Sequence, residues 1–234
     1  YESPDTKRRC FFISDEQYFF QNATPETMKG FYKTVYPLFD DARFYHLMQG
    51  FSLDPRRKIS TFSKGMKKQL SVICAVSSGA DYIFADETFD GLDPVARQAV
   101  KSLFAADIAD RGMTPVVASH NLRELEDICD HVGLLHKGGI IFESDIQDLK
   151  TTLFKLQVGF NKPFSREMFS ALDILSYSAR GSVATFIVRG DREKTVELIR
   201  AHSPVLLDVL PLTLEEVFIY EMEALGYCFK DMIS

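Results

Sequence analysis

The stretch YIFADETFDGLDP, residues 82–94, joins an apolar run to two acids. The run has the length and composition of a buried strand, and Asp86 and Glu87 follow it directly. Ligands of open α/β folds bind at the carboxyl ends of parallel strands. At such an edge one acid can hold Mg²⁺ and the next can orient a water molecule. Two acids after a strand are also common in solvated loops and helix caps, so the stretch alone leaves both interpretations open.

The segments downstream of this stretch alternate between helix and strand. The patterns predict an amphipathic helix over 93–112, a strand over 113–120, a helix over 121–132 and a strand pair over 132–144. Strands that alternate with helices favour a mostly parallel sheet. His120 ends the strand over 113–120, so we expect it at the same sheet edge as the two acids.

The stretch TFSKGMKKQLSVICAV, residues 61–76, has the pattern of a buried helix with a polar and basic start. Free backbone N–H groups and the helix dipole make such an N-terminus suitable for an anion. The lysines near its start oppose the dipole unless an anion is near. Before it, the sequence predicts a strand within 7–15, a helix from Pro25 with Thr24 as its N-cap, and a helix over 41–48.

The order of predicted helices and strands changes after about residue 150. The patterns predict a strand over 153–160, a helix over 165–173, a hairpin that turns at Gly181, a helix over 191–203 and a strand over 205–211. This β-α-β-β-α-β order is the split βαβ, or ferredoxin-like, arrangement. A closing helix is predicted over 213–226.

Three motifs occur here in the order and at about the spacing that ATP-binding cassette (ABC) ATPases have: FSKGMKKQLS, YIFADETFDGLDP and ASHNLRELEDICDHVGLLHKGGI. The chain resembles the nucleotide-binding subunits of ABC transporters, particularly the exporter-type bacterial subunits. The resemblance implies an α/β fold: a P-loop NTPase-like ABC ATPase core, incomplete, with a parallel sheet and a helical subdomain at about 18–78. Residues 1–150 would form this domain, and residues 151–234 a C-terminal α+β ferredoxin-like accessory domain.

The resemblance also implies roles for the acids and the histidine. Asp86 corresponds to the Walker B aspartate that serves Mg²⁺, and Glu87 to the catalytic glutamate that polarises the attacking water. His120 corresponds to the switch histidine. Asp93 falls in the D-loop at the dimer seam, although an Asp-Pro pair before a helix is also a common cap.

The signature motif of the family lies at a helix N-terminus and grips the γ-phosphate of ATP held by the opposite subunit. Here the motif reads Phe62-Ser63-Lys64-Gly65-Met66 in place of the frequent Leu-Ser-Gly-Gly-Gln. Ser63 would supply a hydroxyl, and Gly65 would permit close approach of the backbone. Lys64 lies between them, so these three residues form the predicted nucleotide-binding segment.

The chain departs from the family pattern in two short segments. Thr88 and Phe89 replace the usual Pro-Thr after the catalytic glutamate, a change expected to alter packing more than chemistry. Asp15 aligns with the Q-loop glutamine and could ligate Mg²⁺ or bond its attacking water. The alignment leaves open whether Asp15 or Glu16 takes this place, and both could be solvated.

No G-x-x-x-x-G-K-[ST] motif occurs among the 13 glycines. That P-loop supplies the backbone cradle, the phosphate-binding lysine and the Mg²⁺ hydroxyl. The family places it before the Q-loop, so we expect the chain to be a fragment truncated ahead of Tyr1. As it stands, the chain should bind ATP poorly and expose an unpaired sheet edge.

The resemblance implies an ATPase subunit of an ABC transporter that uses ATP and Mg²⁺ and powers transport, with export expected. Its partners would be an integral-membrane permease and a second ATP-binding subunit, the same or different. It would be cytoplasmic, held at the inner face of the membrane by the permease. The net charge of −6 argues against broad nucleic-acid binding. The alternatives are a non-transport ABC-type ATPase and a nucleotide-free interaction protein derived from one.

Overall fold

The computed structural model describes residues 3–224 and divides the chain into two compact units, Tyr1–His120 (unit 1) and Asn121–Ser234 (unit 2). The elements of unit 1 follow the order α1 Pro4–Arg8, β1 Cys10–Ile13, α2 Pro25–Val35, α3 Asp41–Gly50, a 3₁₀ turn Ile59–Thr61, α4 Lys64–Ser77, β2 Tyr82–Asp86, α5 Pro94–Arg111 and β3 Thr114–Ala118. The predicted boundary at residue 150 concerns domains rather than compact units, and it stays a prediction.

The helices of unit 1 begin where the sequence indicates. The Thr24 hydroxyl accepts a hydrogen bond from the Thr27 N–H ahead of α2, and Pro25 takes the first helical position. Ser63 caps α4 in the same way. The strand predicted within 7–15 is shorter than expected, because Ser3 and Pro4 start the short helix α1, which takes up Lys7 and Arg8.

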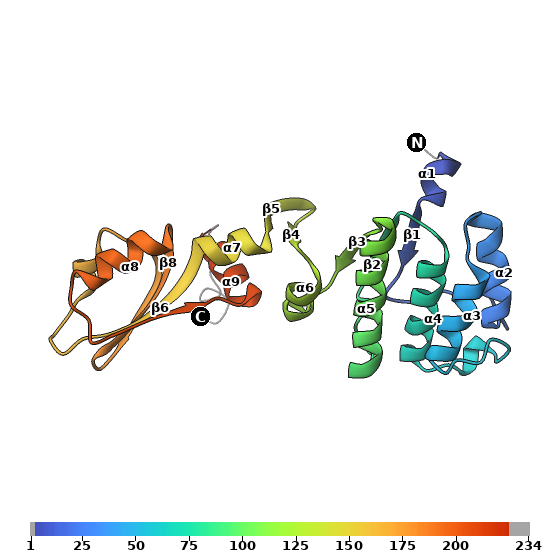
Figure 1. Cartoon of the computed structure of the whole chain (residues 1–234), viewed down its shortest axis with the longest axis horizontal. Coiled ribbons are helices and arrows are strands. Elements are labelled where there is room, and N and C mark those ends of the chain that lie inside the picture. The colour runs from blue at the N-terminus through green and yellow to red at the C-terminus, as the bar shows by residue number, and fades with distance from the viewer. Residues whose placement is uncertain (1–2, 225–234) are drawn as a thin grey trace. The chain divides into compact units, whose positions relative to one another are not determined.

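The sheet of unit 1 is parallel, with strand order β1-β2-β3. Phe11, Ile13, Ile83 and Ala85 on one face are buried, and α4 packs against β1. Helices α2 and α3 contact α4, as Figure 1 shows. The buried Asp107 of α5 accepts hydrogen bonds from Arg43 of α3 and from Arg111, and so ties two helices together.

The other face of this sheet carries exposed apolar side chains. Phe12, Phe84 and Val116 lie in one row across the three strands and are 65%, 38% and 48% exposed. Parallel sheets are usually covered on both faces. This face of unit 1 therefore has the character of a surface that another segment covers.

Unit 2 contains α6 Leu122–Ile128, β4 His131–His136, β5 Gly139–Asp145, α7 Ile146–Thr152, β6 Leu153–Gly159, a 3₁₀ turn Arg166–Phe169, β7 Asp173–Arg180, β8 Val183–Arg189, α8 Arg192–Arg200, β9 Leu206–Pro211 and α9 Leu214–Ala224. Strands β4 and β5 form the predicted hairpin. The end of the predicted helix over 213–226 lies outside the described residues.

The second sheet of unit 2 is antiparallel, with strand order β7-β8-β6-β9. This order is that of the split βαβ arrangement predicted from the sequence. The helix predicted over 165–173 is wrong, because only the 3₁₀ turn Arg166–Phe169 forms there. Ser165 makes no capping side-chain hydrogen bond, and Phe169 is the turn's one buried residue.

Candidate active site

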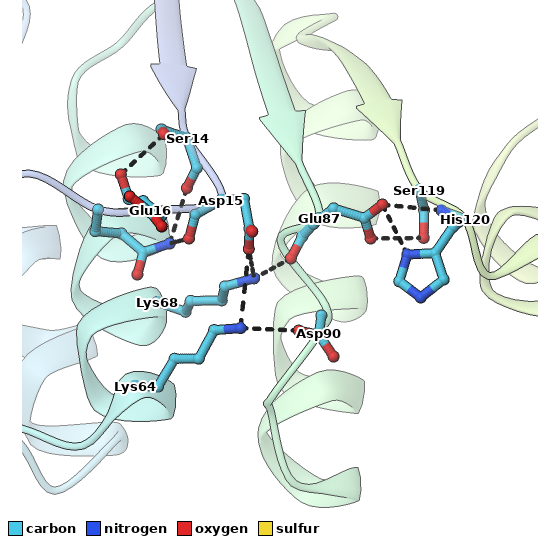
Figure 2. A network of polar contacts seen from close by, with 10 residues as sticks. Ser14, Asp15, Glu16, Lys64, Lys68, Glu87, Asp90, Ser119 and His120 are labelled. Carbon is cyan, nitrogen blue, oxygen red and sulfur yellow. Dashed lines mark hydrogen bonds and ion pairs between the residues drawn. The ribbon is translucent and has the colours of Figure 1, made fainter.

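The carboxyl ends of β1, β2 and β3 lie at one edge of the parallel sheet (Figure 2). The β2–β3 register places Asp86 opposite Ala118, so Glu87 and the pair Ser119 and His120 leave the sheet side by side. Asp15 follows the end of β1 at the same edge. The structure thus brings together residues that are far apart in the sequence.

The Glu87 carboxylate is held by the end of β3. Its Oε1 accepts a hydrogen bond from the His120 backbone N–H at 3.0 Å and lies 2.8 Å from His120 Nδ1. Its Oε2 accepts from the Ser119 hydroxyl at 3.4 Å. Oε2 keeps a further lone pair, so the carboxylate can accept a hydrogen bond from a water molecule. The closeness of Glu87 and His120 is as expected, while their catalytic roles stay predictions.

Asp86 is the candidate metal ligand. It ends β2 and is partly exposed, and its carboxylate has no hydrogen-bond or ion-pair partner among residues 3–224. Within the same residues, no group of three or more His, Cys, Asp or Glu is placed to hold a metal. Mg²⁺ bound beside phosphates usually takes only one or two protein carboxylates. A free carboxylate at this edge fits that requirement.

The predicted nucleotide-binding segment lies at the N-terminus of α4. The Ser63 hydroxyl caps the helix by accepting from the Met66 N–H at 3.2 Å. A Cβ on Gly65 would lie 3.0 Å from the Gly91 carbonyl oxygen. Within this chain, the backbone of Gly65 therefore closely approaches the loop that follows Glu87.

Two of the three lysines of α4, Lys64 and Lys68, have carboxylate partners in the same chain. Lys64 Nζ lies 3.0 Å from Asp90 Oδ2 and 4.0 Å from Asp15 Oδ1. The hydrogen bond and charge of Asp90 raise the pKa of Lys64, and Lys64 lowers the pKa of Asp90. Lys68 Nζ lies 3.0 Å from Asp15 Oδ1 and donates to the Glu87 carbonyl (Figure 2). Lys64 and Lys68, which oppose the helix dipole, are thus compensated without a bound anion.

The two acids of the loop after β1, Asp15 and Glu16, have different surroundings. The Asp15 carboxylate turns toward Lys68, whereas Glu16 is exposed and its carbonyl accepts from the Ser14 hydroxyl. The Gln17 amide donates to the Ser14 and Asp15 carbonyls at 2.8 and 2.9 Å and folds the loop on itself. Of these residues, Asp15 faces the candidate site.

The residues after Glu87 serve packing and capping. Thr88 and Phe89 are buried, and the Phe89 ring meets Phe104 of α5 edge-on at 6.2 Å. Asp93 Oδ1 accepts from the Val95 and Ala96 N–H groups at 2.9 and 3.0 Å, so Asp93 is the N-cap of α5. A role of Asp93 at a dimer seam stays a prediction.

Two contacts of the site were not predicted from the sequence: that of Lys68 with Asp15 and that of Asp90 with Lys64. A signal existed for Lys68, because it is spaced three and seven residues from Ser71 and Ala75 on the buried face of α4. A lysine on such a face needs a carboxylate partner. The sequence gives no comparable signal for Asp90, whose loop is placed only by the fold.

The candidate site is an open sheet edge and not an enclosed pocket. Ser63 is exposed, and the His120 side chain is 79% exposed. A cavity of about 520 Å³ in unit 1 is lined by residues of α3, α4 and α5 and includes neither Glu87 nor His120. Nothing within residues 3–120 closes the edge from water.

Comparisons with known proteins show relatives among ABC transporter ATP-binding proteins. The chain is 26% identical to the ABC transporter ATP-binding protein YtrB of Bacillus subtilis over 216 residues, which are 92% of the chain and 74% of YtrB. It is 26% identical to the bacitracin transport ATP-binding protein BcrA of Bacillus licheniformis over 71% of the chain and 55% of BcrA. Five further curated relatives are matched over about half of their length or less. No family model matches the chain.

A solved structure of the ATP binding subunit of an ABC transporter shares the fold, with a TM-score of 0.57 and 24% identity over 63% of each chain. The fold is thus common to that structure and to this chain. The chain is therefore similar in sequence to ABC transporter ATP-binding proteins and shares the fold of one such subunit.

Proposed function

We propose that this chain is part of an ATP-binding and ATP-hydrolysing subunit that powers transport, with export as the direction, through a separate membrane permease. The observation that carries the proposal is the Glu87 carboxylate, fixed by His120 next to the free carboxylate of Asp86 at the carboxyl edge of a parallel sheet. The relatives named for bacitracin and other transport support the transport role.

In this proposal Glu87 orients and polarises the attacking water, while His120 holds the Glu87 carboxylate and faces the γ-phosphate. Asp86 would hold Mg²⁺, which neutralises charge on the phosphate oxygens when it is bound. Asp15 lies at the same edge of the sheet, paired with Lys68. Catalysis of this kind rests on positioning and charge stabilisation more than on covalent chemistry.

Ser63 and Gly65 would serve the ATP of a second subunit. The α4 N-terminus offers backbone N–H groups to an anion, and the site is open to solvent on that side. Closing such a site against water requires another surface. A head-to-tail partner, with Asp93 at the seam, supplies that surface in the proposal.

The 234 residues contain no phosphate-binding loop, so ATP binding of this kind needs a loop outside them. We propose that it precedes Tyr1 and that its elements cover the apolar sheet face with Phe12, Phe84 and Val116. We also propose a cytoplasmic location at the membrane through the permease. None of the helices within residues 3–224 is both long and apolar enough to cross a bilayer.

Hydrolysis by the protein that carries this chain together with its phosphate-binding loop tests the proposal. Glu87→Gln should lower kcat at least about a hundredfold while ATP binding persists, because only the water-polarising carboxylate is lost. Glu197→Gln, which removes an exposed carboxylate of α8 in unit 2, should leave kcat unchanged. Equal effects of the two variants would refute the role of Glu87. Tight, saturable Mg-ATP binding by the 234 residues alone would refute the need for the external loop.

A further inference from the structure

Lys68 is a buried cation inside the candidate site. Its side chain is 0% exposed, and its ammonium group contacts one carboxylate oxygen, Asp15 Oδ1 at 3.0 Å, and one backbone carbonyl, that of Glu87. Burial of an ammonium group is unfavourable unless it is paired and hydrogen-bonded. Lys68 therefore depends on both partners to offset its burial. One of these partners is the backbone carbonyl of Glu87, the candidate catalytic residue.

The backbone of Glu87 is in a conformation that requires support. Its φ is +45°, in the left-handed region that residues other than glycine rarely adopt. Such a conformation persists only when surrounding contacts fix it. The Glu87 N–H donates to the Ala118 carbonyl at 2.9 Å, and its carbonyl accepts from the Asp90 N–H at 3.2 Å and from Lys68.

Of these contacts, the one from Lys68 is charge-assisted, and its donor side chain is fully buried. The Asp90 contact joins two neutral backbone groups, and charge-assisted hydrogen bonds are about twice as strong as neutral ones. The direction of the Glu87 carboxylate toward His120 follows from its backbone. A group that fixes the carbonyl of Glu87 thus also aims its carboxylate.

We propose that Lys68 is a positioning residue: its ammonium group, held by Asp15, fixes the left-handed backbone of Glu87 and so aims the Glu87 carboxylate at His120. The catalytic meaning of this positioning rests on the proposed function, but the positioning itself does not. Asp15 acts in this arrangement as the counter-ion of Lys68. Asp15 and Lys68 therefore form a functional pair that links the end of β1 to Glu87.

The first test measures backbone hydrogen exchange in the 234-residue chain without nucleotide. Lys68→Met keeps the buried apolar stem and removes the ammonium group, and the Asp15 carboxylate left behind is 43% exposed and stays solvated. The amides of Glu87 and Asp90 should exchange about tenfold faster or more, the factor expected from the loss of one charge-assisted hydrogen bond. Lys67→Met, which removes the neighbouring charge, should leave both rates unchanged.

Wild-type exchange rates at Glu87 and Asp90 in folded Lys68→Met would overturn the proposal. If Lys68→Met does not fold, Asp15→Gln keeps the lysine but removes its counter-ion. It should accelerate the same two amides, and unchanged rates in that variant would overturn the proposal equally. A ¹⁵N signal of the His120 ring that shifts in Lys68→Met and not in Lys67→Met would show that the carboxylate has turned.

The second test uses the protein with its phosphate-binding loop. Lys68→Met should lower kcat about tenfold or more at nearly unchanged KM, because the loss affects the aim of Glu87 and not ATP binding. A raised KM at wild-type kcat would contradict positioning. If the wild-type protein hydrolyses no ATP, the proposed function fails, while the exchange measurement still decides whether Lys68 positions Glu87.

Discussion

Replacement of Gly65 by alanine should destabilise unit 1, although alanine is the better helix former. The added Cβ would lie 3.0 Å from the Gly91 carbonyl oxygen, closer than an unstrained contact allows. Relief requires the loop from Glu87 to Asp93 to move. That loop is tied to α4 by Lys64 at Asp90 and by Lys68 at Glu87, so it resists the movement.

Two opposing effects decide the size of the change. Glycine to alanine in a helix interior gains up to about 1 kcal/mol, and less in the first turn, where Gly65 lies. Overpacking against a fixed backbone atom costs about 1–3 kcal/mol. We therefore expect a net loss of about 1 kcal/mol or more in the free energy of unfolding, or about a fivefold larger open population.

The labelling rate of Cys74 measures that population. Cys74 is fully buried in α4, and burial raises the pKa of its thiol, so a thiol reagent reacts with it only after unit 1 opens. Mass spectrometry of the peptide that contains Cys74 separates its labelling from that of the other three cysteines. Gly65→Ala should be labelled about fivefold faster than the wild type.

Gly30→Ala is the matched control. Gly30 lies inside α2, and a Cβ there would meet nothing within 4 Å. Only the gain in helix propensity remains, so labelling of Cys74 should slow by about fivefold. If both variants slow labelling, the contact between Gly65 and Gly91 does not constrain the fold and the reasoning is refuted.

Three further predictions concern caps, the sheet face and pH. Asp93→Ala should cost about 1 kcal/mol through loss of the α5 cap, and Asp93→Ser should restore most of it, as read by Cys74 labelling. Phe12→Ser should reduce self-association in sedimentation without faster labelling, whereas Phe11→Ser, at a side chain only 2% exposed, should destabilise unit 1 by about 3–5 kcal/mol. Burial raises the pKa of Tyr36 from 10.0 to about 12, so the unfolded chain loses this proton first. The contribution of Tyr36 to the free energy of unfolding should be fully present below pH 10 and be lost as the pH rises to 12. Tyr36→Phe should therefore reduce the fall in the thermal midpoint over this pH range.

Elements with local signals were predictable from the sequence. Helices α2 and α5 each begin at a proline after a capping side chain, Thr24 or Asp93, and neither signal depends on the rest of the fold. The helix predicted over 165–173 failed because Ser165 does not cap and only one residue of the segment's 3₁₀ turn is buried. Apolar spacing without a cap was insufficient there.

The candidate site was predictable in part for a related reason. Strand ends determine which residues share a sheet edge, and this rule predicted that Glu87 and His120 lie together. The pairing of Asp15 with Lys68 joins residues 53 positions apart in a loop and a helix. No periodicity connects them, so the partner of the buried lysine emerged only from the tertiary structure.

The charges at this edge also change how the signature segment can act. The acids of the edge are Asp15, Asp86, Glu87 and Asp90, and its cations are Lys64 and Lys68. Both ammonium groups are already engaged by carboxylates, so the described residues of the edge present an excess of negative charge to a phosphate. Under the proposed function, attraction must then come from the N–H groups of α4, the Ser63 hydroxyl, Mg²⁺ at Asp86 and groups outside these residues. For Lys64 and Lys68, a place at a basic helix start next to a phosphate-binding motif is therefore poor support for lysine–phosphate contact, because these two lysines organise the acids that surround them.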